Sequence, residues 1–273
     1  RRRHRPPVHP IRGDRPMTTA DAFEPVAVAG RSGLDESFHH GAVVALGADG
    51  SIEFAVGDPD VVVYPRSSNK PFQAVAMVRA GLRLPDELLA LVCASHDGTP
   101  EHVTGVERIL AGVGLDESAL GNTEDLPLDP DAARDVLRAG GGRRTVTMNC
   151  SGKHAGMVAT CVTCGWPADA SYLDPDHPLQ RRITAVVEEL AGESVGHVGV
   201  DGCGAPAHAL SLAGLARAIR SVALPSGDDA CLTVARAMRE HPVMVGGRRR
   251  DVTALMRSIP GLVAKDGAEG VMA

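Results

Sequence analysis

The chain has 273 residues, of which 44% are hydrophobic and 23% charged, and this composition excludes disorder over most of its length. Residues 1–16 carry six arginines against one aspartate, so the rest of the chain is more acidic than the net charge of −6 suggests. An acidic body with only 3% aromatic residues excludes a typical nucleic-acid binder. No window approaches the ~18 apolar residues of a membrane span. We expect a soluble, cytoplasmic protein with no nucleic-acid or membrane partner.

The first 16 residues predict a disordered basic extension, because they contain neither the apolar core of a signal peptide nor an amphipathic period. Met17 is the expected start, and residues 17–273 are expected to form a single domain. The runs GAVVALG (41–47) and SIEFAVG (51–57) are joined through Ala-Asp-Gly, which predicts a β-hairpin. A sheet is therefore expected before the first helix.

Helical periodicity dominates the remainder of the chain. Helices are predicted over residues 71–84, 85–95, 151–166, 176–192 and 207–223, with broken helical segments over 100–140. The stretches 142–150 and 261–273 are strand-like, and 194–206 predicts a strand that leads into a glycine-rich turn. Because strands and helices mix without a regular βαβ repeat, the expected fold class is α+β (mixed α/β).

Lysine is rare in this chain, where only three of the 28 basic residues are lysines: Lys70, Lys153 and Lys265. Arginine is permanently charged, whereas a desolvated ammonium can lose its proton and act as a base. The three lysines are therefore the first candidates for chemistry.

Ser67 precedes Lys70 by three positions in RSSNKPFQ, so the two side chains share one face of a helix opening. An amine can activate such a hydroxyl as a nucleophile. A lysine base working near neutrality needs its pKa lowered from ~10.4 to about 7–8, which burial and a second cation can impose. Pro71 places the helix start near Ser68 and Ser67 at its positive end. The alternative is a chance pair in which Ser68 only caps the helix.

The segment CASHDGTPEH (93–102) places Ser95 close to His96, Asp97 and His102 in the sequence. Neighbouring side chains diverge, so these residues cannot build a catalytic triad by themselves. Ser95 is interpreted as a second active-site hydroxyl, and His102 as a structural histidine.

Two cysteines stand in glycine-rich turns, Cys150 in MNCSGKHAGM and Cys203 in VDGCGAP. Six cysteines without an export signal indicate thiols or metal ligands and not disulfides. With a nitrogen from Lys153 or His154, the two thiolates would form a three-ligand zinc site with an open position. The alternative is a pair of buried free thiols.

Five ordered segments, PRSSNKPFQ, CASHDGTPEH, NCSGKHAGM, VDGCGAP and LVAKDGAEG, resemble the motif series of the Rhizobium etli-type L-asparaginases, the asparaginase II family. The resemblance runs from about Val26 to the last residue. It implies hydrolysis of L-asparagine to L-aspartate and ammonia by a homodimer. The implied fold is similar to glutaminases and serine β-lactamases, a mainly antiparallel sheet packed with helices. Members continue beyond the last motif, so residues 17–273 are expected to be a catalytic domain without its C-terminal part.

The resemblance also assigns roles to single residues. It implies two Ser-Lys tandems, in which Ser67 is the nucleophile with Lys70 as its base, and Ser95 with Lys265 forms a proton relay and second cation. The implied zinc ligands are Cys150, Lys153 and Cys203, with water as the fourth, and this metal assists substrate binding more than the chemical step. The implied substrate-pocket residues are Arg66, His154 and Asp201, of which Asp201 would hold the ammonium group.

Two segments depart from the family pattern. Asp97 and Thr99 stand where the pattern predicts serine and glutamate, and GGRRRDVT (246–253) only loosely resembles the Gly-Arg-Asp-Thr loop of the family. Pocket details near His96 are therefore not carried over.

Two other functions stay open at the level of sequence. One methylene in the substrate is worth only ~1–3 kcal/mol in a pocket, so a glutaminase or another β-lactamase-like Ser-Lys acyl hydrolase is the closest rival. A non-catalytic zinc-binding protein is the second, and it would need only the two cysteines and their neighbours.

Overall fold

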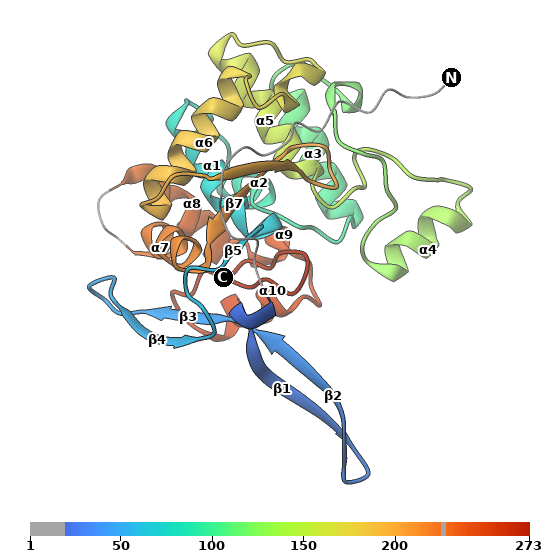
Figure 1. Ribbon diagram of the computed structural model, residues 1–273. Coiled ribbons are helices and arrows are strands. Elements are labelled where there is room, and N and C mark those ends of the chain that lie inside the picture. The colour runs from blue at the N-terminus through green and yellow to red at the C-terminus, as the bar shows by residue number, and fades with distance from the viewer. Residues whose placement is uncertain (1–19, 225–227) are drawn as a thin grey trace, which may run out of the picture.

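The computed structural model describes residues 20–224 and 228–273 (Figure 1). The predicted extension at residues 1–16 lies outside these described ranges. The strands are β1 (Glu24–Arg31), β2 (Leu34–Gly41), β3 (Val43–Leu46), β4 (Ile52–Val56), β5 (Val62–Val63), β6 (His197–Val200) and β7 (Pro206–Ser211). The larger helices are α1 (Lys70–Arg79), α2 (Asp86–Val92), α3 (Pro100–Ala111), α4 (Pro130–Arg138), α5 (Ser151–Cys164), α6 (Pro178–Ala191), α7 (Leu212–Ala223), α8 (Asp229–Glu240), α9 (Pro242–Val245) and α10 (Asp251–Ser258).

The strands pair only antiparallel, in three small sheets within the described residues. Hairpin β1–β2 extends from the body of the molecule, and hairpin β3–β4 lies beside α7 (Figure 1). The third sheet has the order β5–β7–β6. The predicted α+β class with antiparallel pairing is confirmed, and so is the hairpin over 41–57. The domain limits 17–273 stay a prediction.

Three predicted segments need correction. Residues 207–211 belong to strand β7 and not to a helix. All of them are buried, and a short run that is buried on both faces shows neither the helical nor the strand period, so the sequence pattern does not reveal the strand. The stretch 142–150 forms turns, with only Arg144 bridged to Asp125. At 261–273 the chain folds back on itself, so that Lys265 and Ala273 exchange backbone hydrogen bonds of 2.8 and 3.0 Å in place of a strand.

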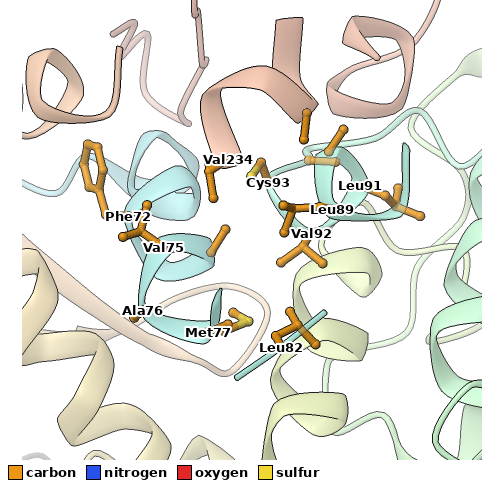
Figure 2. Close-up of a cluster of buried hydrophobic side chains, with 14 of the residues drawn as sticks. Phe72, Val75, Ala76, Met77, Leu82, Leu89, Leu91, Val92, Cys93 and Val234 are labelled. Carbon is orange, nitrogen blue, oxygen red and sulfur yellow. The ribbon is translucent and has the colours of Figure 1, made fainter. Parts of the chain in front are cut away.

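The main hydrophobic core lies between α1, α2 and the helices around them. Phe72, Met77, Leu91 and Val234 are among its buried side chains (Figure 2). No described helix is long and apolar enough to cross a membrane.

Helix α5 contacts α2 through glycines. A Cβ added at Gly152 would lie 2.3 Å from the carbonyl oxygen of Leu91, and one added at Gly156 would lie 2.7 Å from the side chain of Val92. Any larger residue would push the two helices apart. The two glycines thus set how closely α5 packs against α2, and with it where Lys153 lies.

Candidate active site

Ser67 lies in a 3₁₀ turn, Arg66–Asn69, that runs directly into α1. Side chains three apart in such a turn lie one above the other, so Ser67 and Lys70 share a face. Ser67 is half-buried and Lys70 is fully buried. Arg66 has a φ of 53°, a left-handed conformation that costs free energy for a non-glycine residue and is often found at functional sites.

The Lys70 amine points toward the end of α2. It donates to the carbonyl oxygen of Ala94, and its Nζ lies 3.3 Å from Ser95 Oγ and 3.1 Å from Cys150 Sγ. Within residues 20–224 and 228–273, no hydrogen bond joins the Ser67 hydroxyl to this amine. The structure therefore links Lys70 directly to Ser95, and to Ser67 only through their shared face.

Ser95 receives a second amine from the far end of the chain. Lys265 Nζ lies 2.9 Å from Ser95 Oγ and is fully buried. Two buried ammonium groups at one hydroxyl repel each other. Burial, and after it the charge of Lys70, lowers the pKa of Lys265 to about 8. Lys265 can therefore exchange a proton closer to neutral pH than an ordinary lysine can.

The segment that carries Lys265 packs against the turn that carries Ser67. Ser68 does not cap α1 but donates from Oγ to the carbonyl oxygen of Lys265, at 3.0 Å. Gly267 allows this contact, because a Cβ there would lie 2.3 Å from the carbonyl oxygen of Pro65. The segments that carry the two predicted Ser-Lys tandems thus pack against each other.

The two cysteines lie together with Lys153. Cys150 and Cys203 form a small buried cluster with Ala205, and Lys153 Nζ lies 3.2 Å from Cys203 Sγ. A hydrogen bond from Cys150, supported by the charge of Lys153, holds the pKa of Cys203 far below its ordinary value despite burial. The same hydrogen bond, with burial, raises the pKa of Cys150.

This donor set suits a zinc ion only if lysine takes part. In the part of the chain that the structure describes, no three His, Cys, Asp or Glu side chains gather as a metal-binding group. Two sulfurs and the Lys153 nitrogen nevertheless meet, and zinc accepts sulfur and nitrogen donors with one position open. His154 bonds through Nδ1 to the Tyr172 hydroxyl at 2.7 Å, and burial, then Lys153, lowers its pKa to about 4.

Arg66 and Asp201 form an ion pair at the edge of this cluster. Arg66 donates from Nε to Asp201 Oδ1 at 2.8 Å and from its terminal nitrogen at 2.7 Å. Asp201 is supplied by the turn after β6, and Arg66 by the turn before α1. Both side chains keep partial exposure, 29% and 14%, so the pair is open to a solute.

The hydrogen bonds of the histidines after Ser95 go to other residues in the described part of the chain. His96 pairs through Nε2 with Ser151 at 2.9 Å and accepts from the backbone of Gly98 through Nδ1 at 3.1 Å. His102 stacks on His96, with ring centroids 5.2 Å apart, and bonds to Thr99 and Val243. All their ring nitrogens are engaged, which agrees with a structural role and with the absence of a local triad.

Sequence reasoning missed two residues next to the cluster, Asp266 and Arg250. Asp266 accepts from Lys265 Nζ at 2.6 Å, and Arg250 pairs with Asp266. A charged residue directly after Lys265 was the available signal for Asp266. Arg250 is one of three consecutive arginines, and no pattern in the chain distinguishes it from the other two.

A buried hydroxyl flanked by two amines, one with a lowered pKa, is an arrangement of enzymes that activate serine with lysine. A cluster of this kind can carry acyl-transfer chemistry. A family model described as L-asparaginase II matches residues 27–273, and the chain belongs to this family of amidohydrolases. No individually curated protein matches the chain.

Proposed function

We propose that this protein hydrolyses L-asparagine to L-aspartate and ammonia, as an asparaginase of the Rhizobium etli type that uses a lysine-activated serine. The observation that carries the proposal is the position of Ser95 Oγ, 3.3 Å from Lys70 Nζ and 2.9 Å from Lys265 Nζ. Membership of the L-asparaginase II family supports the substrate.

Ser67 is the proposed nucleophile. The amine of Lys70 takes the Ser67 proton while Oγ bonds to the side-chain amide carbon of the substrate. The C–N bond then breaks, and the leaving nitrogen takes a proton back through Lys70, Ser95 and Lys265. Water attacks the resulting ester with the same amine as base, releasing aspartate and restoring the Ser67 hydroxyl. The N-terminal end of α1, close by, stabilises the negative oxygen of each addition step.

Arg66 and Asp201 are the proposed anchors of the amino-acid end of asparagine. A guanidinium matches the α-carboxylate, and a carboxylate matches the α-ammonium. In the structure the two groups neutralise each other. Bound substrate would replace this one ion pair with two, one from Arg66 to the α-carboxylate and one from Asp201 to the α-ammonium. His154 is proposed to line the same pocket.

Cys150, Lys153 and Cys203 are the residues that would hold zinc. The chemistry such an ion supplies is Lewis-acid charge stabilisation and fixed orientation. Lys70 contacts Cys150 directly, so the thiol pair borders the reaction site, and the ion is proposed to aid substrate binding and not bond cleavage. A cytoplasmic homodimer stays a prediction.

The first test is hydrolysis of asparagine, glutamine and a β-lactam, measured side by side as ammonia release from the two amino acids and as ring opening of the β-lactam. We expect asparagine to have the highest kcat/KM. Faster release from glutamine would replace this function with the glutaminase alternative. If all three substrates are inert in a folded, zinc-loaded protein, the enzymatic proposal fails and the zinc-binding alternative takes its place.

A second test identifies the nucleophile. Ser95, which contacts both amines, is the alternative to Ser67. Substrate is mixed with enzyme, quenched in acid, and the acylated peptide is located by mass spectrometry. Acylation on Ser67, lost in Ser67→Ala and kept in Ser95→Ala, is the expected result. Acylation on Ser95 would exchange the roles of the two serines.

A further inference from the structure

The hydrogen bond between Lys265 and Ser95 joins two residues that are 170 positions apart in the chain. Ser95 follows the C-terminal end of α2, and Lys265 lies in the segment 261–273, where the chain forms neither helix nor strand. Such a segment needs side-chain contacts to hold an amine in place. Ser68 holds the backbone carbonyl of Lys265, and Asp266 and Arg250 supply the contacts on the side of its amine.

Asp266 holds the Lys265 amine. Its backbone carbonyl and its Oδ1 both lie 2.6 Å from Lys265 Nζ. Together with Ser95 Oγ at 2.9 Å, they direct the three N–H groups of the ammonium. Rotation of the amine away from Ser95 would break two other hydrogen bonds.

Arg250 connects the segment that carries Lys265 with the segment that carries Ser95. Its guanidinium pairs with Asp266, which follows Lys265, and lies 3.9 Å from Asp97 Oδ1, two residues after Ser95. Asp97 is 7% exposed and Asp266 21%, so both carboxylates are shielded from solvent. One fixed fork can engage two acceptors at once, which an ammonium cannot do with the same rigidity.

The backbone before Arg250 is fitted to the Ser95 segment. Ser95 donates from its N–H to Val245 at 3.0 Å, and Asp97 donates to Gly246 at 2.8 Å. Gly247 has a φ of 147°, and a Cβ there would lie 1.7 Å from Asp97 Oδ2. Glycine is thus required at position 247 for the loop to approach Asp97. This close approach supports, independently of the ion pairs, that the loop carrying Arg250 is fitted to the Ser95 segment.

The two arginines before Arg250 have different partners. Arg248 pairs with Glu101 and Arg249 with Asp131, with side chains 70% and 79% exposed against 30% for Arg250. Exposed pairs of this kind contribute little to stability. They therefore provide matched controls within the same loop.

We propose that Arg250 is a positioning residue, which through Asp97 and Asp266 holds the Lys265 amine against the Ser95 hydroxyl. The role rests on the function proposed above, since it concerns the proton relay of that reaction. Arg250 does not touch the reacting atoms. It acts on the rate of proton transfer and not on the binding of the amino acid, which belongs to Arg66 and Asp201.

The test compares Arg250→Gln with the control Arg249→Gln and with wild type. A misplacement of about 1 Å costs on the order of 100-fold in rate, so we expect Arg250→Gln to lower kcat for asparagine ~10- to 100-fold, with KM changed less than about twofold. Arg249→Gln should match wild type in both constants. Equal kcat in all three proteins would overturn the proposal, and so would a loss confined to KM.

A second readout separates the positioning role from the choice of substrate. A fluorophosphonate labels an activated serine whatever the substrate is, and its rate is measured by intact-protein mass spectrometry. If wild type is labelled but releases no ammonia from asparagine, the proposed substrate fails, while at least tenfold slower labelling of Arg250→Gln still supports the positioning role. Labelling at the wild-type rate would overturn it.

Should Arg250→Gln not fold, the isosteric Asp266→Asn removes the charge that Arg250 binds and keeps the backbone acceptor of Lys265. Its control is Asp131→Asn, which removes the partner of Arg249 at the surface. The same fall in kcat and in labelling rate is expected for Asp266→Asn alone. Wild-type rates in a folded Asp266→Asn protein would overturn the proposal.

Discussion

Lys265 and Lys153 are both buried to 2% exposure or less, yet their pKa values move in opposite directions. Burial opposes the charge of each. At Lys265 the neighbouring cation Lys70 adds to burial, and the pKa falls to about 8. At Lys153 the sulfurs of Cys203 and Cys150 outweigh burial, and the pKa rises. The sign of the nearest charge therefore separates an amine suited to proton transfer from an amine that supports the thiolate of Cys203.

Within this comparison of Lys265 with Lys153, the largest expected effect comes from removing the Lys265 amine. Lys265→Met should lower kcat for asparagine about 10²- to 10⁴-fold, the usual range for losing a general acid or base. The apolar replacement needs no buried charge partner, so the protein is expected to stay folded. Ammonia release under saturating substrate measures the effect, with the surface variant Arg236→Gln as control. A kcat within threefold of wild type would contradict the role of Lys265.

The cluster of Lys153 with Cys150 and Cys203 is tested by measuring how much zinc it binds. Cys203→Ala should lower zinc affinity at least about 100-fold, because a ligand is lost outright and outer contacts alone are worth 10- to 100-fold. Elemental analysis after dialysis measures zinc per chain. Cys231→Ala is the matched control, since Cys231 is also a buried free thiol but lies on α8. Undiminished zinc in Cys203→Ala would rule out this site.

The pH dependence of kcat sharpens the contrast between the two lysines. In the proposed relay, Lys265 receives a proton through Ser95, which it can do only in its neutral form. Because the pKa of Lys265 is about 8, kcat should rise by up to tenfold per pH unit toward pH 8 and then level off. Lys70, Asp266 and Cys150 are the charged or titratable neighbours that act on this pKa. Initial rates in buffers from pH 6 to 10 measure the profile. A profile that is flat between pH 6 and 8 would contradict Lys265, with this pKa, as the proton acceptor of the relay.

The smallest effect concerns the placement of Lys153 by α5. Gly152→Ala puts a methyl group 2.3 Å from the Leu91 carbonyl oxygen, and overpacking of this kind costs about 1–3 kcal/mol of unfolding free energy. Gly142→Ala is the control, because a Cβ there meets nothing within 4 Å. Urea unfolding of both variants gives the comparison. Equal midpoints would mean that α5 and α2 can separate without cost.

The candidate lysines and part of the fold can be predicted from the sequence, because they depend on local patterns. The scarcity of lysine pointed to all three amines, and the hairpin over 41–57 follows from its turn residues. Strand β7 was predicted as helix, because AHALS is buried on both sides and carries no period.

The direct contact of Lys70 with Ser95, and the bridge that Arg250 makes, depend on segments far apart in the chain. No spacing rule reaches across 170 residues, and only packing brings Lys265 beside Ser95. The role of Ser67 stays a prediction that the acylation experiment tests, and the roles of Arg66, His154 and Asp201 stay predictions.

The account depends most directly on a proton-accepting amine at position 70. Lys70→Arg keeps a positive charge in the same turn but supplies a group that does not lose its proton in proteins. Ammonia release from asparagine by this variant, with its thermal unfolding matched to wild type, is the decisive measurement. The account predicts a loss of about 10³-fold or more. Release at the wild-type rate would contradict lysine-activated serine catalysis in this protein.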